Sequence, residues 1–384
     1  MRIWLLLGFL LVLPSERLHA EGLSDQEFEL RVKKGVDHIY NLEFEQAEKE
    51  FTELVRAKPK DPAGHFFLAM VNWWRIMIDM DNTRYDDQFI DSLDAVIDLC
   101  DDLLDKNGND VNAMFFKGGA IGFEGRLKFH RNDYLGAASA GKKALPLVQE
   151  ASTADPGNYD IFLGTGLYDY FADVIPEEYP WTKPLLLFLP AGDRQKGLKQ
   201  LSICAEKGKY AAIESSYLLL QIYYGYEKDY QKALVLALSL NNRFPNNPVF
   251  QRYLGRCYVS VNNWQMVQSV FGEVAARAYK KQRGYSDVAL REAEYYLGLC
   301  DMNNKKYEAA LTHLFKCDEL SRKVDKDETS GFMVMANLKA GMAYDALGKR
   351  SLAEMEYRKV LDMKEYLNSH RQAEDFLKIP FTVR

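Results

Sequence analysis

A spacing of 34 residues recurs along the chain, and it constrains the fold more than any other feature of the sequence. In the first copy the small residues Gly35 and Ala47 are followed by the large Phe51 and then by Pro59. Ala69 stands one period after Gly35 and belongs to the second copy. A period of this length is typical of stacked helical hairpins, because one hairpin alone cannot bury its apolar face. We therefore expect an array of hairpins rather than one compact core.

The same pattern returns in the second half of the chain. Its small, large and helix-ending positions are Ala233, Pro245, Leu254, Gly255, Tyr258, Phe271, Leu297, Gly298, Ala310, Gly341, Tyr344, Ala353 and Tyr357. In the middle, Gly118 and Gly164 take the first-helix positions, but the second helices, near 133–153 and 193–206, follow only after insertions. The pattern predicts about eight hairpins without a sheet, each stacked only on its neighbours.

These positions resemble the repeat of the tetratricopeptide (TPR) superfamily, in which small residues mark close helix contacts and a large residue fills the core. The resemblance covers nearly all of the chain after the first 20 residues. It implies an all-α, right-handed solenoid of antiparallel helical hairpins, with a concave groove lined by the first helix of each hairpin. It also implies binding of other proteins, often in scaffolds, and no catalytic residue or cofactor.

The first 20 residues have the pattern of a secretory signal peptide. Arg2 gives a short positive region, residues 3–13 are apolar, Pro14 interrupts them, and Ala20 offers a small residue for cleavage. The apolar stretch is too short to span a bilayer, which favours a cleaved signal over a retained membrane anchor. The sequence has no Asn-x-Ser/Thr acceptor, which favours a bacterial envelope. We expect an exported protein, periplasmic or secreted after cleavage near Ala20, with a continuous solenoid over 21–384.

Charge and residue types exclude several functions. The net charge of −6 and the pI of about 5.7, without a run of Lys or Arg, exclude a nucleic-acid partner. The six His are dispersed, and segment 136–143 has Lys143 where a phosphate-binding loop needs Ser or Thr. We therefore expect no enzyme activity, no metal and no cofactor. The five Cys are scattered without metal spacing, which is typical of buried structural thiols.

The candidate partner-binding groove follows from the TPR resemblance, which places certain positions of each first helix on the concave surface. The residues at these positions include Phe66, Met70, Trp73, Trp74, Tyr168, Tyr226, Arg252, Arg256, Tyr295 and Leu299. Aromatic anchors in a concave surface suit a helical or extended peptide. The alternative is that superhelical curvature closes the groove, so that these rings pack on one another.

Two arginines form a separate candidate within this set. Arg252 and Arg256 lie one helical turn apart and should point the same way. Such a pair resembles part of the clamp with which some TPR domains hold a terminal carboxylate, but Leu218 and Ile222 occupy the preceding slots, so the full clamp is absent. The pair predicts either a local anion-binding spot or ordinary ion pairing with neighbouring acids.

A proline-rich apolar insert interrupts the array at about 174–192. It contains Pro176, Pro180, Pro184, Pro190, Trp181 and the run 185–189, which includes Leu185 and Phe188. Prolines this dense forbid a continuous helix. We expect the insert to fold back on the first-helix surface near Tyr168 and Phe171, with Asp193 as the N-cap of the next helix. The alternative is an exposed loop that contacts a partner or a membrane surface.

The leading hypothesis is a non-catalytic scaffold or adaptor of the cell envelope. Its partner would be another protein or peptide held in the concave groove. The alternative hypothesis is a carrier that encloses an apolar small molecule or a lipid in an aromatic cavity. An open groove favours the scaffold, and a closed apolar cavity favours the carrier.

Overall fold

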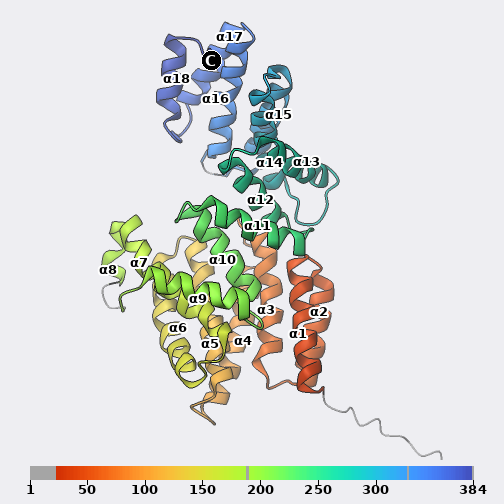
Figure 1. Ribbon diagram of the computed structural model, residues 1–384, viewed down its shortest axis with the longest axis vertical. Helices are drawn as coiled ribbons and strands as arrows, with labels where there is room; N and C mark the ends of the chain where they lie inside the picture. Colours follow the sequence, from red (N-terminus) through yellow and green to blue (C-terminus); the bar gives the residue numbers. More distant parts are fainter. Residues whose placement is uncertain (1–22, 187–189, 327, 383–384) are drawn as a thin grey trace, which may run out of the picture.

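The computed structural model describes residues 23–186, 190–326 and 328–382, and the chain is all-helical within these ranges (Figure 1). Eight antiparallel hairpins follow one another as an α-solenoid, which confirms the predicted fold class. The first helices of the hairpins are α1 (Asp25–Tyr40), α3 (Pro62–Met77), α5 (Val111–His130), α7 (Phe162–Glu178), α10 (Ala212–Gly225), α12 (Pro248–Ser260), α14 (Asp287–Asn303) and α16 (Gly331–Ala346).

The second helices and several short pieces complete the array. The second helices are α2 (Phe44–Ala57), α4 (Asp86–Leu104), α6 (Tyr134–Ala154), α9 (Arg194–Lys207), α11 (Tyr230–Arg243), α13 (Trp264–Tyr279), α15 (Tyr307–Val324) and α17 (Arg350–Leu361). The short pieces are η1 (Tyr159–Ile161), η2 (Pro180–Thr182) and α8 (Lys183–Leu186), and α18 (Ser369–Lys378) packs against the last hairpin. The expected signal peptide lies outside the described residues and stays a prediction.

Six of the hairpins turn through a residue with a positive φ angle, placed two residues before the second helix. These residues are Leu42, Asn132, Lys228, Asn262, Lys305 and Gly348. The chain then bonds back across the end of the first helix, as from Glu43 N to His38 O (2.9 Å) and from Asn263 N to Tyr258 O (2.9 Å). A left-handed residue of this kind satisfies the last carbonyls of a helix and reverses the chain.

Close contact between the two helices of a hairpin requires a small residue opposite a large one. A Cβ atom added to Gly255 of α12 would lie 2.5 Å from Cε2 of Phe271 on α13, so a larger residue cannot fit without movement. A Cβ atom added to Gly298 of α14 would lie 2.9 Å from the side chain of Leu314 on α15. Both contacts occur where the repeat predicts them.

The solenoid does not stack only between neighbours, because its curvature brings the first hairpin back against α10, α11 and α12 and against the turn after α13. Tyr40 at the end of α1 donates a hydrogen bond to Glu214 of α10 (3.0 Å), and its backbone oxygen accepts one from Asn247 (2.9 Å). Its ring packs against Phe244 (5.3 Å between centroids) and Phe250 (6.1 Å). The expectation of neighbour-only stacking is therefore wrong here, since one apolar core joins helices from α1 to α15.

The last helices lie outside this closed part. Figure 1 shows α16, α17 and α18 projecting beyond the body formed by the earlier hairpins. Their apolar residues form two separate clusters, one between α15 and α16 and the other among α16, α17 and α18. Among the described residues, no hydrogen bond, ion pair or ring contact joins α16–α18 to α1–α13. The curvature that closes the early repeats does not cover these last ones.

The five cysteines are free and buried, which confirms their interpretation as structural thiols. Burial raises the pKa of the Cys100 and Cys257 thiols to about 12, so they are protonated at neutral pH. No helix within the described ranges combines the length and the apolar character that crossing a membrane requires.

Candidate binding surfaces

The early part of the predicted groove is filled by its own side chains. Phe66, Met70, Trp73 and Trp74 are all buried, with exposed fractions of 0% for Trp73 and 1% for Trp74. The ring of Trp74 lies 4.9 Å from that of Tyr40 and belongs to the same packed set as α10 and α12. A partner cannot reach these four residues in this structure, so here the curvature closes the groove.

A buried carboxylate fixes this closure electrostatically. Glu214 of α10 accepts a hydrogen bond from Arg126 of α5 (2.6 Å) and another from Tyr40 of α1. The guanidinium of Arg126 also lies over the ring of Trp73, 4.8 Å from its centroid. Burial, together with the charge of Glu214, raises the pKa of Tyr40 well above its usual value. Three hairpins that are distant in sequence are thus joined through one acid.

Arg252 and Arg256 bind an acid of the chain itself. Glu292 of α14 is fully buried and accepts hydrogen bonds from Nε of Arg252 (2.7 Å) and from Nε of Arg256 (2.5 Å). Burial alone would raise the pKa of Glu292, but the two guanidinium groups outweigh it and lower the pKa to about 2. The ion-pairing interpretation is the one seen here, and the pair is not a free anion-binding spot.

Tyr168 and Tyr226 lie beside the insert and are half-buried. The hydroxyl of Tyr168 donates a hydrogen bond to the backbone oxygen of Pro190, and the ring of Tyr226 lies 5.4 Å from that of Phe171. Tyr168 therefore fixes the end of the insert, and Tyr226 packs α10 against α7, so neither residue lines an open groove.

In the late repeats, α14 and α16 keep a row of side chains that are not fully buried. These half-buried residues are Tyr295, Leu299 and Met302 of α14 and Phe332, Met335, Lys339 and Met342 of α16, and we call this set the α14–α16 face. The ring centroids of Tyr295 and Phe332 lie 5.5 Å apart, so the two helices contact each other within this set. Spacings of three and four residues put the members from each helix on one side of that helix. The α16 members were missed in the sequence, although this spacing is visible there.

Lys339 is the one charged member of the α14–α16 face. Its ammonium has a single polar contact among the described residues, with Sδ of Met342 (3.6 Å). Burial lowers the pKa of Lys339, and no neighbouring charge opposes this shift. The face therefore combines apolar side chains with one ammonium that has no counter-charge in the described chain.

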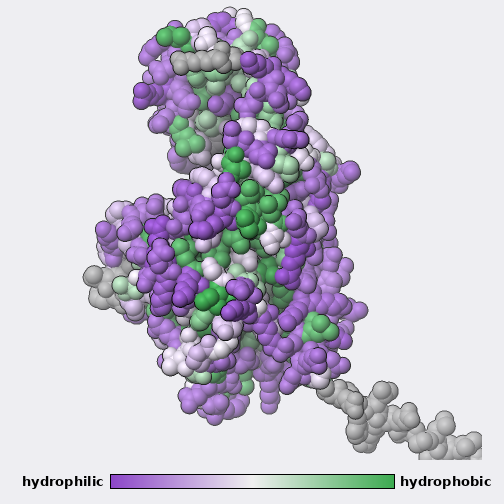
Figure 2. All heavy atoms as spheres, viewed as in Figure 1, coloured by the Kyte–Doolittle hydropathy of each residue, from purple (hydrophilic) through white to green (hydrophobic). Residues whose placement is uncertain are grey.

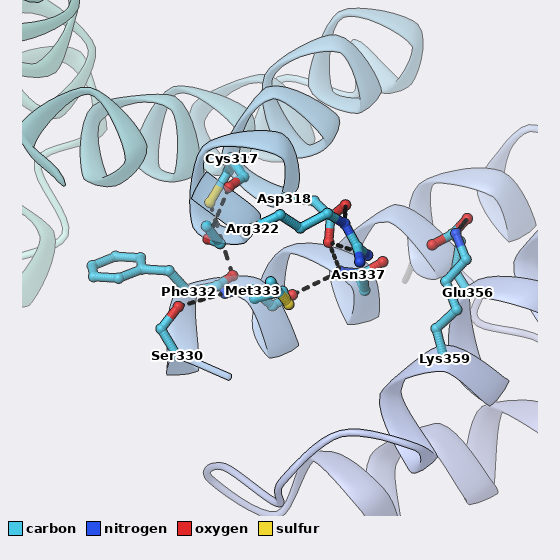
Figure 3. A network of polar contacts seen from close by, with 10 residues as sticks. Cys317, Asp318, Arg322, Ser330, Phe332, Met333, Asn337, Glu356 and Lys359 are labelled. Atoms are coloured by element: carbon cyan, nitrogen blue, oxygen red, sulfur yellow. Dashed lines mark hydrogen bonds and ion pairs between the residues drawn. The ribbon is translucent and has the colours of Figure 1, made fainter. Parts of the chain in front are cut away.

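Polar contacts fix the opposite side of α16 (Figure 3). The amide of buried Asn337 donates a hydrogen bond to Oδ1 of Asp318 on α15 (2.7 Å), and Oδ2 of Asp318 accepts one from Arg322 (2.9 Å). Asn337 and Lys339 are two residues apart, which is about half a turn of an α-helix. The contacts with α15 thus orient α16 so that Lys339 and its neighbours point away from the packed side.

The insert folds back on α7, as expected, where it ends. The hydrogen bond from Tyr168 reaches Pro190, and the side chain of Asp193 caps the first turn of α9. A Cβ atom added to Gly192 would lie 2.5 Å from the backbone nitrogen of Asp173, so the chain passes too close to α7 for a larger residue. The predicted N-cap and the predicted contact with Tyr168 are confirmed.

The first part of the insert is not covered from within, which corrects the expectation for Trp181. This side chain is 56% exposed, and its ring contacts Tyr134 of α6 (5.3 Å), which in turn contacts the exposed Phe129 (5.5 Å). We call these three rings the insert ledge. The side chain of Leu185 and the whole of Phe188 lie outside the described residues, so that part of the prediction is untested.

A third apolar region lies on the outer surface. Figure 2 shows a mostly hydrophilic face on which apolar side chains gather near α11 and α12. On α11, Val235 is exposed, and Leu234 and Leu238 are half-buried. These three α11 residues lie on a second helix, and none of them is charged.

No known protein family matches the sequence, and no curated protein matches it either. Several solved helical-repeat structures are similar over most of their length. Yeast Tom70 is 12% identical, with 92% of this chain and 88% of that chain covered at a TM-score of 0.38. The apo form of RapI is 13% identical, with 93% of this chain and 99% of that chain covered at a TM-score of 0.41. The TPR domain of P58(IPK) is 14% identical, with 92% of this chain and 88% of that chain covered at a TM-score of 0.28. Identities and TM-scores this low say nothing about what this chain binds.

Proposed function

We propose that this protein is a non-catalytic scaffold of the cell envelope that binds another polypeptide on the α14–α16 face. The observation that carries the proposal is the contrast between the early and the late repeats. Phe66, Trp73 and Trp74 are buried by the closed superhelix, whereas Leu299 and Tyr295, whose ring contacts Phe332, are only half-buried. A partly exposed apolar surface on rigid helices is typical of a protein-binding site.

The envelope location rests on the sequence of the first 20 residues. A positive residue, a short apolar stretch and Ala20 are typical of a cleaved export signal. Fractionation of cells that express the full chain tests this part. The expected result is a mature chain in the envelope fraction whose N-terminus lies close to residue 21, and an uncleaved cytoplasmic chain contradicts it.

Site-specific photo-crosslinking in cells tests the binding face. A photoreactive residue at Met302 of the α14–α16 face should give a discrete crosslinked protein. The same residue at Val235, which is exposed on α11, is the matched control and should give none. Crosslinks that arise at Val235 but not at Met302 would show that the partner binds elsewhere.

The carrier alternative gains no support from the geometry. An enclosed ligand would need apolar space among the early groove residues, but the rings of Trp74, Tyr40 and Phe250 contact one another instead. We therefore do not propose it as a second function.

A further inference from the structure

Lys339 differs from the other partly buried cations that the structure describes. Arg126 is paired with Glu214 (2.6 Å), Arg131 with Asp86 (2.6 Å) and Arg291 with Asp325 (2.5 Å). The ammonium of Lys339 has its one described polar contact with a thioether, and no described carboxylate lies within ion-pair distance of it. Because a charge removed from water is costly unless it is paired, an unpaired ammonium on a surface needs an explanation.

The surroundings of Lys339 are apolar on both sides along α16. Met335 lies one turn before it and Met342 one turn after it, which separates the two thioethers by about 10 Å along the helix axis. Leu299 and Met302 of the adjacent α14 are half-buried too, and Met302 packs against the apolar cluster between α15 and α16. Methionine side chains adapt to different apolar partners. The face thus offers one cationic point inside an apolar surface that continues in both directions.

We propose that the α14–α16 face binds a polypeptide segment through an internal Asp or Glu side chain that pairs with Lys339, flanked on both sides by apolar side chains. The inference rests on the proposed function and specifies its ligand. The carboxylate is assigned to a side chain, not to a chain end, because the apolar surface extends beyond Lys339 in both directions. In an extended segment the apolar side chains would lie about two residues from the acid, since each residue spans about 3.3 Å.

We also expect that removing the charge of Lys339 keeps or raises the stability of the free protein and weakens its binding. Half-burial lowers the pKa of Lys339, so the charged form is disfavoured in the free protein. Lys339→Met keeps the length of the side chain and removes the charge. The free variant should melt at the same temperature as the wild type or above it, and its binding should be weaker.

Selection of peptides from a random display library on the mature chain provides the probe. Peptides enriched on the wild type should carry an acid with apolar residues on both sides. Synthetic copies should bind K339M at least about tenfold more weakly, the loss expected for one charge-assisted hydrogen bond. The matched control Lys142→Met, on the exposed surface of α6, should bind them like the wild type. Replacing the acid of the peptide by its amide should weaken binding equally, and amidating its C-terminus should change nothing.

Two results would overturn the inference. One is equal binding of the peptides to K339M and to the wild type, and the other is dependence on the terminal carboxylate alone. In either case a crosslink at Met302 would still support the proposed function, so the two failures can be told apart. If K339M is unfolded, Lys339→Gln serves as the second variant, with the same criteria.

Discussion

Replacing Glu292 with Gln should destabilise the protein strongly at neutral pH. The carboxylate is fully buried and pairs with Arg252 and Arg256, so a neutral amide leaves two guanidinium groups without a counter-charge. The pair of arginines, working against burial, lowers the pKa of Glu292 from 4.5 to about 2. This difference in pKa corresponds to about 3 kcal/mol of stability, since a shift of one pKa unit is worth about 1.4 kcal/mol. The value agrees with the cost of about 3–5 kcal/mol that is typical of breaking a buried ion pair.

The pH dependence of this loss follows from the direction of the shift. The pKa of Glu292 is lower in the folded protein than in the unfolded chain, so its contribution is present above about pH 4.5 and disappears as the pH falls towards about 2. The difference in free energy of unfolding between the wild type and E292Q should therefore narrow on acidification. Urea unfolding at a series of pH values, followed by circular dichroism, measures both quantities.

Glu45→Gln is the matched control for this experiment. Glu45 also pairs with an arginine, Arg283, but its side chain is 63% exposed, so its loss should cost less than about 1 kcal/mol. If E292Q and E45Q are equally stable at neutral pH, or if the difference does not narrow at low pH, the account of the Arg252–Arg256–Glu292 cluster is wrong.

Three further changes test other parts of the structure. Gly255→Leu should cost about 1–3 kcal/mol by overpacking against Phe271, and an unchanged melting temperature would show that the helices do not touch there. Nδ1 of His313 donates a hydrogen bond to Oε2 of Glu294 (2.6 Å), which raises the pKa of His313. The loss of stability in His313→Gln should therefore be larger at about pH 6 than at about pH 9, and a loss that does not change with pH contradicts this ion pair. Trp181→Ser should change stability by less than about 1 kcal/mol, since the ring is exposed, whereas a loss of several kcal/mol would mean that the insert ledge is covered. If the ledge contacts membranes, the same variant should sediment less with anionic vesicles, and unchanged sedimentation would remove that role.

The hairpins were predictable because their signals are local. Gly255 and Phe271 face each other within one hairpin and are only 16 residues apart. The sequence therefore shows the pair directly, as a small residue followed at a fixed distance by a large one. The N-cap Asp193 is local in the same way, because it depends on the few residues that follow it. Neither feature requires knowledge of the rest of the superhelix.

The closure of the early groove could not be predicted from these local signals. It depends on the rotation accumulated over several repeats, which brings Tyr40 against Glu214 although they are 174 residues apart. The same accumulation buries Trp73 and Trp74, which a repeat-by-repeat interpretation places on an open groove. The repeat spacing is compatible with an open and with a closed groove, because it does not give the rotation from one repeat to the next.

The α14–α16 face was only half visible in the sequence. Tyr295 and Leu299 were identified through their repeat positions, whereas Lys339 lies at a position that the TPR resemblance does not assign to the groove. Its importance comes from the absence of an acid near its ammonium in the described chain, and that is a tertiary property. A list of repeat positions therefore could not have found it.

Hydrogen–deuterium exchange of the mature protein, with and without a selected acidic peptide, locates the surface that binds the peptide. We expect the peptide to slow exchange in the exposed turns of α14 and α16 and to leave α3 and α5 unchanged, because the early groove is filled. Slowing that is confined to α3, α5 and α10, with none in α14 and α16, would mean that the superhelix opens to admit its partner, and it would contradict the account.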